Sequence, residues 1–213
     1  MKNNALSSLF ILLSIISLSS CQKHVPKIQV YIESLCPDCQ YFINRSLKDF
    51  VEMVTKPNLA DIELVPYGNA DETYDEKTGK WVFECQHKEN ECYGNLIETC
   101  LIHNLGRVES HKKIICIESN IDGFNRDFDK TLEFCLNKDA DIIKEINDCV
   151  ASDMGNIYQH QMAQKTLEHD YVPWILVDGV HDTQAESVII ESLIDYVCGD
   201  DRSKCFTELQ LFE

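Results

Sequence analysis

The segment VYIESLCPDCQYF, residues 30–42, constrains the fold more than any other part of the chain. Apolar and polar residues alternate at 28–34, and several side chains there are β-branched, which predicts a strand. Two cysteines separated by two residues follow this strand. Residues 37–54 then place apolar side chains at helical spacing, with Pro37 where the first turn of a helix tolerates proline. A Cys-x-x-Cys pair at a strand-to-helix junction is typical of a redox-active site in an α/β fold.

The two cysteines are predicted to have different roles in thiol–disulfide exchange. Cys36 lies at the start of the predicted helix, where unpaired backbone N–H groups and the macrodipole favour its thiolate, the attacking species. Cys39 follows one turn later and can form the intramolecular disulfide that releases a substrate. The carboxylate of Asp38 acts in the opposite sense, because it repels a thiolate. We therefore predict Cys36 as the attacking cysteine and Cys39 as the resolving cysteine.

Two other interpretations of the pair remain open. A metal site needs further close ligands, but six and seven residues separate Cys85, Cys92 and Cys100, unlike the tight knuckles of zinc sites. We therefore expect no metal. A purely structural bridge between Cys36 and Cys39 is the second alternative, and such a short loop strains it.

Residues 1–21 have the layout of a cleaved secretory signal. Lys2 precedes an apolar stretch at 6–18, and small residues follow. The stretch is short for a membrane span, and a retained anchor is the alternative. Residues 18–21 also fit a bacterial lipoprotein box, in which Cys21 is lipidated. Loss of Cys21 with the signal leaves an even number of cysteines, which favours complete pairing, so we expect cleavage.

The composition of the chain limits which partners it can bind and in which compartment it matures. The formal net charge is −17, which argues against nucleic acid and anionic membranes as partners because both would repel the chain. The length suits one domain that buries a proper core without needing disulfides merely to fold. The many cysteines therefore indicate maturation in an oxidising compartment of the secretory pathway.

The rest of the chain places strand patterns on both sides of a helical block. Residues 61–68 and 81–85 are predicted strands, with a polar loop at 69–80 between them. Five helical patterns follow, at 91–105, 111–119, 126–136, 139–152 and 155–168. Residues 171–179 return to a strand that ends in a tight Asp178–Gly179 turn, and 184–198 are predicted to form a helix.

This order of elements predicts a single α/β domain at 22–213 with helices inserted in the middle of its sheet. We expect the core at about 26–84 and 169–198 and the helical insertion at about 85–168. A C-terminal disulfide loop and tail, 199–213, complete the domain.

Pro173 is a second signal, far from the cysteines in sequence. In YVPWILVDG it heads a predicted strand, the place where thioredoxin-like folds carry a cis-proline beside their redox cysteines. Such a proline leaves the backbone of its neighbour free to pair with an extended substrate. The alternative is an ordinary strand-edge proline. With the upstream pair, the pattern favours the cis form and predicts substrate contacts at four residues: Pro37, Asp38, Val172 and Pro173.

The segment CQHKENECYGNLIETC, residues 85–100, closely resembles the signature of the gamma-interferon-inducible lysosomal thiol reductase family, Cys-Gln-His-Gly-x2-Glu-Cys-x2-Asn-x4-Cys. VPYGNA at 65–70, the pair at 36–39, YVPW at 171–174 and the late pair Cys198 and Cys205 also look like family blocks. The matching signature positions are Cys85, Gln86, His87, Glu91, Cys92, Asn95 and Cys100. Lys88 replaces the family glycine, and it would be strained if that glycine has a positive φ.

The resemblance implies a disulfide-stapled, thioredoxin-like fold with a helical insertion. It also implies reduction of disulfide-containing protein substrates in endosomes and lysosomes, without a cofactor and with a small thiol as external reductant. No membrane partner is expected for the mature form. Only Cys198–Cys205 can be paired from the sequence among the eight expected structural cysteines, which are Cys85, Cys92, Cys100, Cys116, Cys135, Cys149, Cys198 and Cys205.

Two side chains near these motifs have open roles. His87 either donates or accepts a proton near the thiols or, as we favour, fixes its loop through hydrogen bonds. Asn44 begins the only N-glycosylation sequon, on the predicted helix, and a sugar there would have to point outward.

Two competing functions also remain open. A secreted or periplasmic oxidase or isomerase would use the same fold and chemistry in the other direction. A non-catalytic, disulfide-stapled binding protein would not depend on Cys36 and Cys39 at all.

Overall fold

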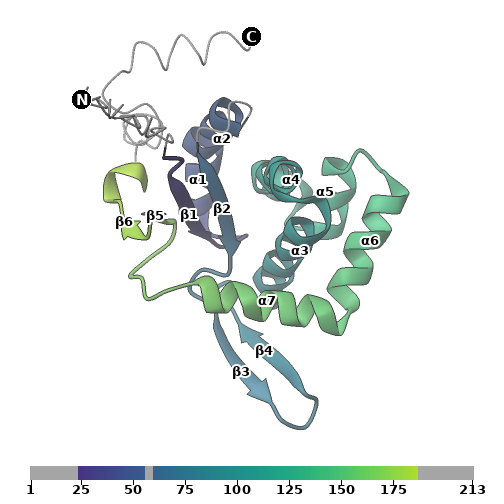
Figure 1. Cartoon of the computed structure of the whole chain (residues 1–213). Coiled ribbons are helices and arrows are strands. Elements are labelled where there is room, and N and C mark those ends of the chain that lie inside the picture. Colours follow the sequence, from purple (N-terminus) through teal and green to yellow (C-terminus); the bar gives the residue numbers. More distant parts are fainter. Residues whose placement is uncertain (1–23, 56–59, 187–213) are drawn as a thin grey trace, which may run out of the picture.

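The computed structural model describes residues 24–55 and 60–186, which form a mixed α/β structure (Figure 1). The expected signal at 1–21, Cys198, Cys205, the tail and most of the closing helix lie outside these residues. The main sheet has four strands in the order β2-β1-β5-β6. Its central strand is β1 (Lys27–Ile32), which pairs in parallel with β2 (Asp61–Pro66) and antiparallel with β5 (Trp174–Val177).

The sheet is covered on both faces, which explains the apolar composition of β1. Ile28, Val30 and Ile32 have no exposed surface, and neither does Tyr31 on the opposite face. The predicted turn at Asp178–Gly179 joins β5 to β6 (Val180–His181), and both of its residues have positive φ, 50° and 81°. The predicted strands at 28–34, 61–68 and 171–179 are therefore confirmed.

The predicted helix at 37–54 is confirmed, with one irregularity. It consists of α1 (Pro37–Phe42), a π-helical segment η1 (Ile43–Leu47) and α2 (Lys48–Thr55), which follow one another without a break. The predicted apolar face packs inward, and its buried members in the described part are Phe42, Leu47, Phe50 and Val51.

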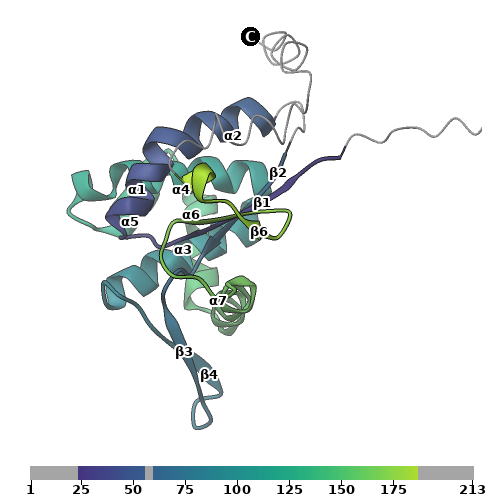
Figure 2. The same ribbon diagram turned by 90° about the vertical axis from the view of Figure 1, so that its left-hand side faces the viewer.

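The predicted polar loop at 69–80 is wrong over much of its length, because it contains β3 (Asp71–Asp75). This strand forms a separate two-stranded ribbon with β4 (Lys80–Glu84), the predicted strand at 81–85. The ribbon projects from the body of the molecule (Figures 1 and 2). The residues of β3 are exposed or only half-buried. The strand therefore needs no apolar alternation, and its sequence resembles a loop.

The side chain of Trp81, near the turn between the two strands, packs this ribbon against the rest of the molecule. Its ring lies 3.8 Å from that of His160 and 5.2 Å from that of Tyr74, between ring centroids. The backbone N–H of Trp81 also donates to Asn156 Oδ1 at 2.9 Å. Contacts with residues distant in sequence, rather than the local pattern, therefore stabilise the ribbon.

All five predicted helices of the middle block are present. They are α3 (Glu89–Leu105), α4 (Arg107–Asn120), α5 (Phe128–Cys135), α6 (Ala140–Ala151) and α7 (Asp153–Lys165), with a 3₁₀ turn η2 (Ile121–Phe124) after α4. Side chains of Asp127, Asp139 and Ser152 cap α5, α6 and α7 by accepting backbone N–H groups. None of the helices in the described ranges is long and apolar enough to cross a membrane.

Six of the expected structural cysteines form disulfides in pairings that the sequence left open. Cys100–Cys149 joins α3 to α6, and Cys116–Cys135 joins α4 to α5. Cys85–Cys92 closes the loop that leads into α3. All three bridges lie in the segment between β4 and α7, and two of them join helices to one another.

Candidate active site

Cys36 occupies the N-cap of α1, as the sequence predicts. Its Sγ accepts the backbone N–H of Cys39 at 3.4 Å, and both cysteines are free thiols. Cys36 keeps 7% of its surface exposed, whereas Cys39 has none. Only the first sulfur is therefore open to a substrate.

The environment separates the acidities of the two thiols. The pKa of Cys36 is lowered to about 7, chiefly by the hydrogen bond from the Cys39 thiol and also by the backbone N–H groups of Cys39 and Asp38. Burial and the Asp38 carboxylate act in the opposite direction. Burial, together with the hydrogen bond to Cys36, raises the pKa of Cys39 well above its ordinary value. The helix terminus thus contributes as predicted, but the neighbouring thiol contributes more.

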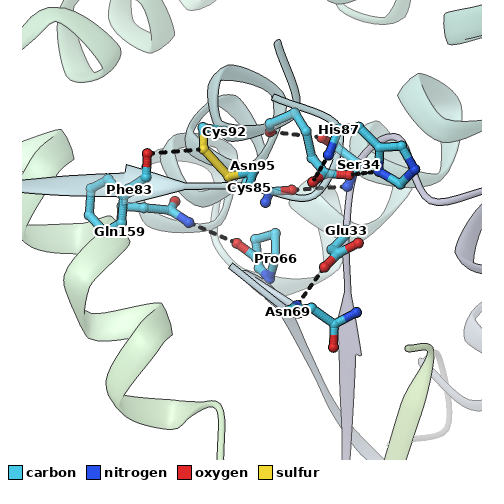
Figure 3. Close-up of a disulfide and its surroundings, with 11 residues drawn as sticks. Glu33, Ser34, Pro66, Asn69, Phe83, Cys85, His87, Cys92, Asn95 and Gln159 are labelled. Carbon is cyan, nitrogen blue, oxygen red and sulfur yellow. Dashed lines mark hydrogen bonds and ion pairs between the residues drawn. A yellow bond between two sulfur atoms is a disulfide. The ribbon is translucent and has the colours of Figure 1, made fainter. Parts of the chain in front are cut away.

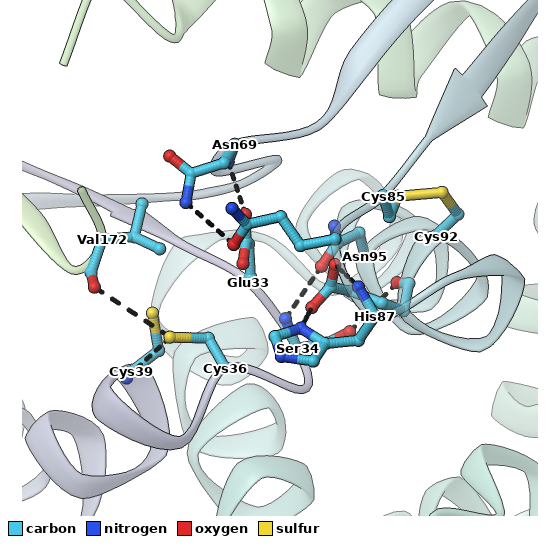
Figure 4. A network of polar contacts seen from close by, with 12 residues as sticks. Glu33, Ser34, Cys36, Cys39, Asn69, Cys85, His87, Cys92, Asn95 and Val172 are labelled. Atoms are coloured by element: carbon cyan, nitrogen blue, oxygen red, sulfur yellow. Dashed lines mark hydrogen bonds and ion pairs between the residues drawn. A yellow bond between two sulfur atoms is a disulfide. The ribbon is translucent and has the colours of Figure 1, made fainter. Parts of the chain in front are cut away.

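The Val172–Pro173 peptide bond is cis, as the sequence pattern favours. Cys36 Sγ lies 4.0 Å from the carbonyl oxygen of Val172, although 136 residues separate the two in sequence (Figure 4). Val172 and Pro173 are buried, whereas Pro37 and Asp38 are exposed beside the sulfur. The structure therefore brings the four predicted substrate-contact residues together around Cys36.

The loop that carries Cys36 is held from behind by the segment at 91–95. Ser34 donates its backbone N–H to Asn95 Oδ1 at 2.9 Å and its hydroxyl to the Glu91 carbonyl at 3.1 Å (Figure 3). Gly94 allows this approach, because a Cβ there would lie 2.3 Å from Ser34 Oγ. Sequence reasoning matched Asn95 to a motif but assigned it no role.

Glu33 is a buried carboxylate that sequence reasoning missed. It has no exposed surface, and its Oε1 accepts the backbone N–H of Asn69 at 2.5 Å. Gly68, at φ 56°, makes room for it, because a Cβ there would lie 2.1 Å from Glu33 Cγ. Burial raises its pKa to about 7, and the charge of Glu91 adds to the effect. In the sequence, Glu33 looks like a solvent-facing residue at the end of a strand.

His87 fixes the loop that the Cys85–Cys92 disulfide closes. Its Nδ1 pairs with the carboxylate of Glu91, and its backbone N–H donates to Glu91 Oε1 at 3.0 Å (Figure 3). This arrangement agrees with the favoured role of His87 as a loop-fixing residue. Lys88 has φ 73°, the positive value that would strain it in place of glycine.

A second buried acidic pair lies in the helical block and was also missed. The carboxyl groups of Glu98 in α3 and Glu118 in α4 interact with each other, and Glu118 also interacts with Gln40 of α1. Both side chains are almost completely buried. Burial raises the pKa of Glu98 to about 7, and burial together with the charge of Glu98 raises the pKa of Glu118. Both carboxyl groups therefore become neutral at a higher pH than an ordinary glutamate does.

Asn44, the predicted glycosylation residue, is exposed on η1, where its side chain accepts the hydroxyl of Ser119. An attached sugar would have to displace this contact. Glycosylation stays a prediction.

The comparisons with known proteins agree on one family. The family model described as gamma interferon inducible lysosomal thiol reductase matches residues 27–139. A protein of that name from Carassius auratus is 38% identical over 177 residues, which cover 80% of this chain and 66% of the relative. One from Mus musculus is 37% identical over 158 residues, 71% of this chain and 60% of the relative.

A plant relative extends the match. The "Gamma-interferon-responsive lysosomal thiol protein" of Arabidopsis thaliana is 31% identical over 184 residues, 84% of this chain and 72% of the relative. The chain thus spans about two thirds or less of the length of the two vertebrate relatives. On the family match and these identities, this chain belongs to the gamma interferon inducible lysosomal thiol reductase family, whose fold is thioredoxin-like.

Proposed function

We propose that this protein is a thiol–disulfide oxidoreductase that reduces protein disulfides through Cys36 and Cys39. The observation that carries this proposal is the position of the Cys36 sulfur at the N-cap of α1, where it accepts the Cys39 N–H. Family membership supports the same activity, since two relatives are named thiol reductases.

The reaction follows from the two different thiols. The Cys36 thiolate attacks one sulfur of a substrate disulfide, the S–S bond breaks, and the departing substrate sulfur takes up a proton. Cys39 then loses its proton and attacks Cys36 Sγ in the mixed disulfide, which releases the second substrate thiol. The substrate gains two electrons, and Cys36 and Cys39 end as a disulfide. An external small thiol restores the pair, so the cycle uses no cofactor.

The lowered pKa supports activity at acidic pH. A thiol of ordinary pKa, ~8.5, is thiolate in only about 1 part in 3,000 at pH ~5. A pKa of about 7 for Cys36 raises that fraction to about 1 part in 100. We therefore propose that reduction proceeds in acidic compartments and accelerates as the pH approaches neutrality.

The substrate contacts follow from the surroundings of the sulfur. The Val172 carbonyl, 4.0 Å from Cys36 Sγ, suits pairing with the backbone of an extended substrate segment. Pro37 and Asp38 lie exposed beside the sulfur, where they would meet the side chains that flank the substrate cysteine.

The compartment is proposed from three observations. The disulfides indicate the secretory pathway, the apolar segment at 6–18 suits a signal, and relatives are named lysosomal. We propose delivery to endosomes or lysosomes, with Asn44 glycosylated on the way. Disulfide-containing proteins and a small thiol are the proposed partners, and the net charge of −17 disfavours nucleic acid.

An insulin-reduction assay from pH 4 to 8 tests the activity. We expect turnover by the wild type, none by Cys36→Ser, and an accumulating mixed disulfide with Cys39→Ser. Turnover by Cys36→Ser, or a Cys39→Ser protein that traps no substrate, would remove the proposal.

One observation favours the reverse direction as a second candidate. Stabilising the Cys36 thiolate stabilises the reduced pair, which makes the couple more oxidising. Equilibration of the Cys36–Cys39 couple with glutathione buffers separates the candidates, because an oxidase has a potential tens of millivolts or more above that of a reductase.

A further inference from the structure

Three potential metal ligands converge beside the redox loop. They are Glu33, at the end of β1, His87, before α3, and Glu91, in the first turn of α3. One ligand atom from each lies within 4.8 Å of the others. Figure 4 shows Glu33 and His87 on the side of the loop where Asn95 holds Ser34.

The charges in this cluster are poorly compensated. Glu33 and Glu91 are completely buried, and within the described ranges the one ion pair that either makes is the pair of Glu91 with His87. The second carboxyl oxygen of Glu33, Oε2, is buried without a hydrogen-bond partner. Burial of a carboxylate oxygen without a partner is unfavourable, so Oε2 is a candidate metal ligand.

The donor set suits a particular class of ion. One imidazole nitrogen with carboxylate oxygens is a common ligand set for Zn²⁺ and similar divalent transition metals, whereas Ca²⁺ and Mg²⁺ prefer oxygen alone. Three protein ligands leave a further position open. The His87 side chain is 36% exposed, so the cluster has a route to solvent.

Neighbouring groups hold these ligands in place. Glu33 Oε1 accepts the Asn69 N–H, and Gly68 gives the side chain its room. Glu91 Oε1 accepts the His87 N–H at 3.0 Å, and the Cys85–Cys92 disulfide closes the loop around both. Such outer contacts are the usual support of a metal site.

We propose that Glu33, His87 and Glu91 form a binding site for a divalent transition-metal ion, with Zn²⁺ as the best fit. The expectation of no metal came from the spacing of the cysteines, which does not bear on this set of ligands. None of the ligands of this site is a redox cysteine, so metal binding can be measured separately from the redox activity. It places a positive charge behind the loop that carries Cys36.

Titration of the full mature chain with Co²⁺ and Zn²⁺ at neutral pH tests the proposal. The titrated protein carries Cys36→Ser and Cys39→Ser, so that thiolates cannot bind the metal. We expect one equivalent of Co²⁺ with a visible absorption band, which Zn²⁺ displaces, and a rise in melting temperature with Zn²⁺. A loss of the reductase activity proposed above would leave these readouts unchanged.

Glu33→Gln and His87→Asn should each weaken binding by about tenfold or more and abolish the thermal shift. Gln at position 33 keeps an acceptor for Asn69, which protects the fold. Matched controls are Glu89→Gln, on an exposed position of the same turn, and His103→Asn, stacked on Tyr158; both should bind as the parent does. Absence of binding, or binding that both ligand variants retain, would overturn the proposal and leave a shared proton as the occupant of the cluster.

Discussion

Asn95 Oδ1 accepts the backbone N–H of Ser34 at 2.9 Å, so a residue in α3 fixes the loop that leads to Cys36. The helical block is therefore part of the support of the redox site. The signature-like segment at 85–95, which contains the Cys85–Cys92 disulfide, contacts this loop through Glu91 and Asn95.

Asn95→Ala should slow disulfide reduction by about tenfold, since a reacting group that is misplaced by even a small distance loses rate steeply. The buried Ser34 N–H also loses its acceptor, and we expect slower alkylation of Cys36. The measurement is the reduction rate, with intact disulfides confirmed by mass spectrometry. Asn90→Ala, on an exposed position of the same helix, is the control and should keep the wild-type rate. An equal loss in both variants would contradict the positioning role of Asn95.

Asp38→Asn should lower the pKa of Cys36 below about 7, because it removes the negative charge that opposes the thiolate and keeps the backbone N–H. It should also make the Cys36–Cys39 couple more oxidising. Rates of iodoacetamide labelling against pH measure the first effect. Asp49→Asn, an exposed carboxylate on α2, is the matched control. A midpoint that is unchanged or raised in Asp38→Asn would count against the electrostatic account.

Acidic pH should stabilise the folded protein through Glu98 and Glu118. Both pKa values are raised in the folded state from an ordinary value of 4.5, that of Glu98 to about 7. The folded chain therefore binds more protons than the unfolded chain from about pH 4.5 to 7, and stability falls as the pH rises through that window. For Glu98 alone the loss is on the order of 3 kcal/mol, or roughly 10 °C in melting temperature.

Glu118→Gln should reduce this dependence, since it removes one titrating group and gives Glu98 an amide partner. Burial lowers the pKa of His111 to about 4, so this residue makes stability rise with pH. Its contribution is the same in the wild type and in Glu118→Gln. Melting temperatures at pH 5 and 7.5 provide the test. If the wild type and Glu118→Gln lose equal stability between pH 5 and pH 7.5, the Glu118 carboxyl group does not have the raised pKa on which this prediction depends.

Gly68→Ala should destabilise the fold by about 3 kcal/mol, through overpacking against Glu33 and a side chain forced to a positive φ. Urea unfolding measures the change. Gly123→Ala is the control, because a Cβ there meets no atom within 4 Å. A Gly68→Ala protein as stable as this control would mean that Glu33 lies elsewhere.

Local sequence patterns were enough to predict much of the fold and the central part of the site. The cysteine pair, Pro173 and the Asp178–Gly179 turn are each encoded within a few residues, which is why their positions could be predicted. β3 could not be, because its pairing with β4 depends on Trp81 and its distant contacts with α7.

The buried carboxylates were missed for a related reason. Glu33, Glu98 and Glu118 have the polar character expected of solvent-facing positions, and packing between distant segments buries them. The disulfide pairings likewise depend on how the helices meet, which spacing does not determine.

The most direct test is the rate of alkylation of each cysteine against pH, followed by mass spectrometry of the reduced protein. We predict labelling of Cys36 with a midpoint near 7 and no labelling of Cys39 in the same range. A Cys36 midpoint at the ordinary thiol value of ~8.5, or labelling of Cys39 first, would contradict the account.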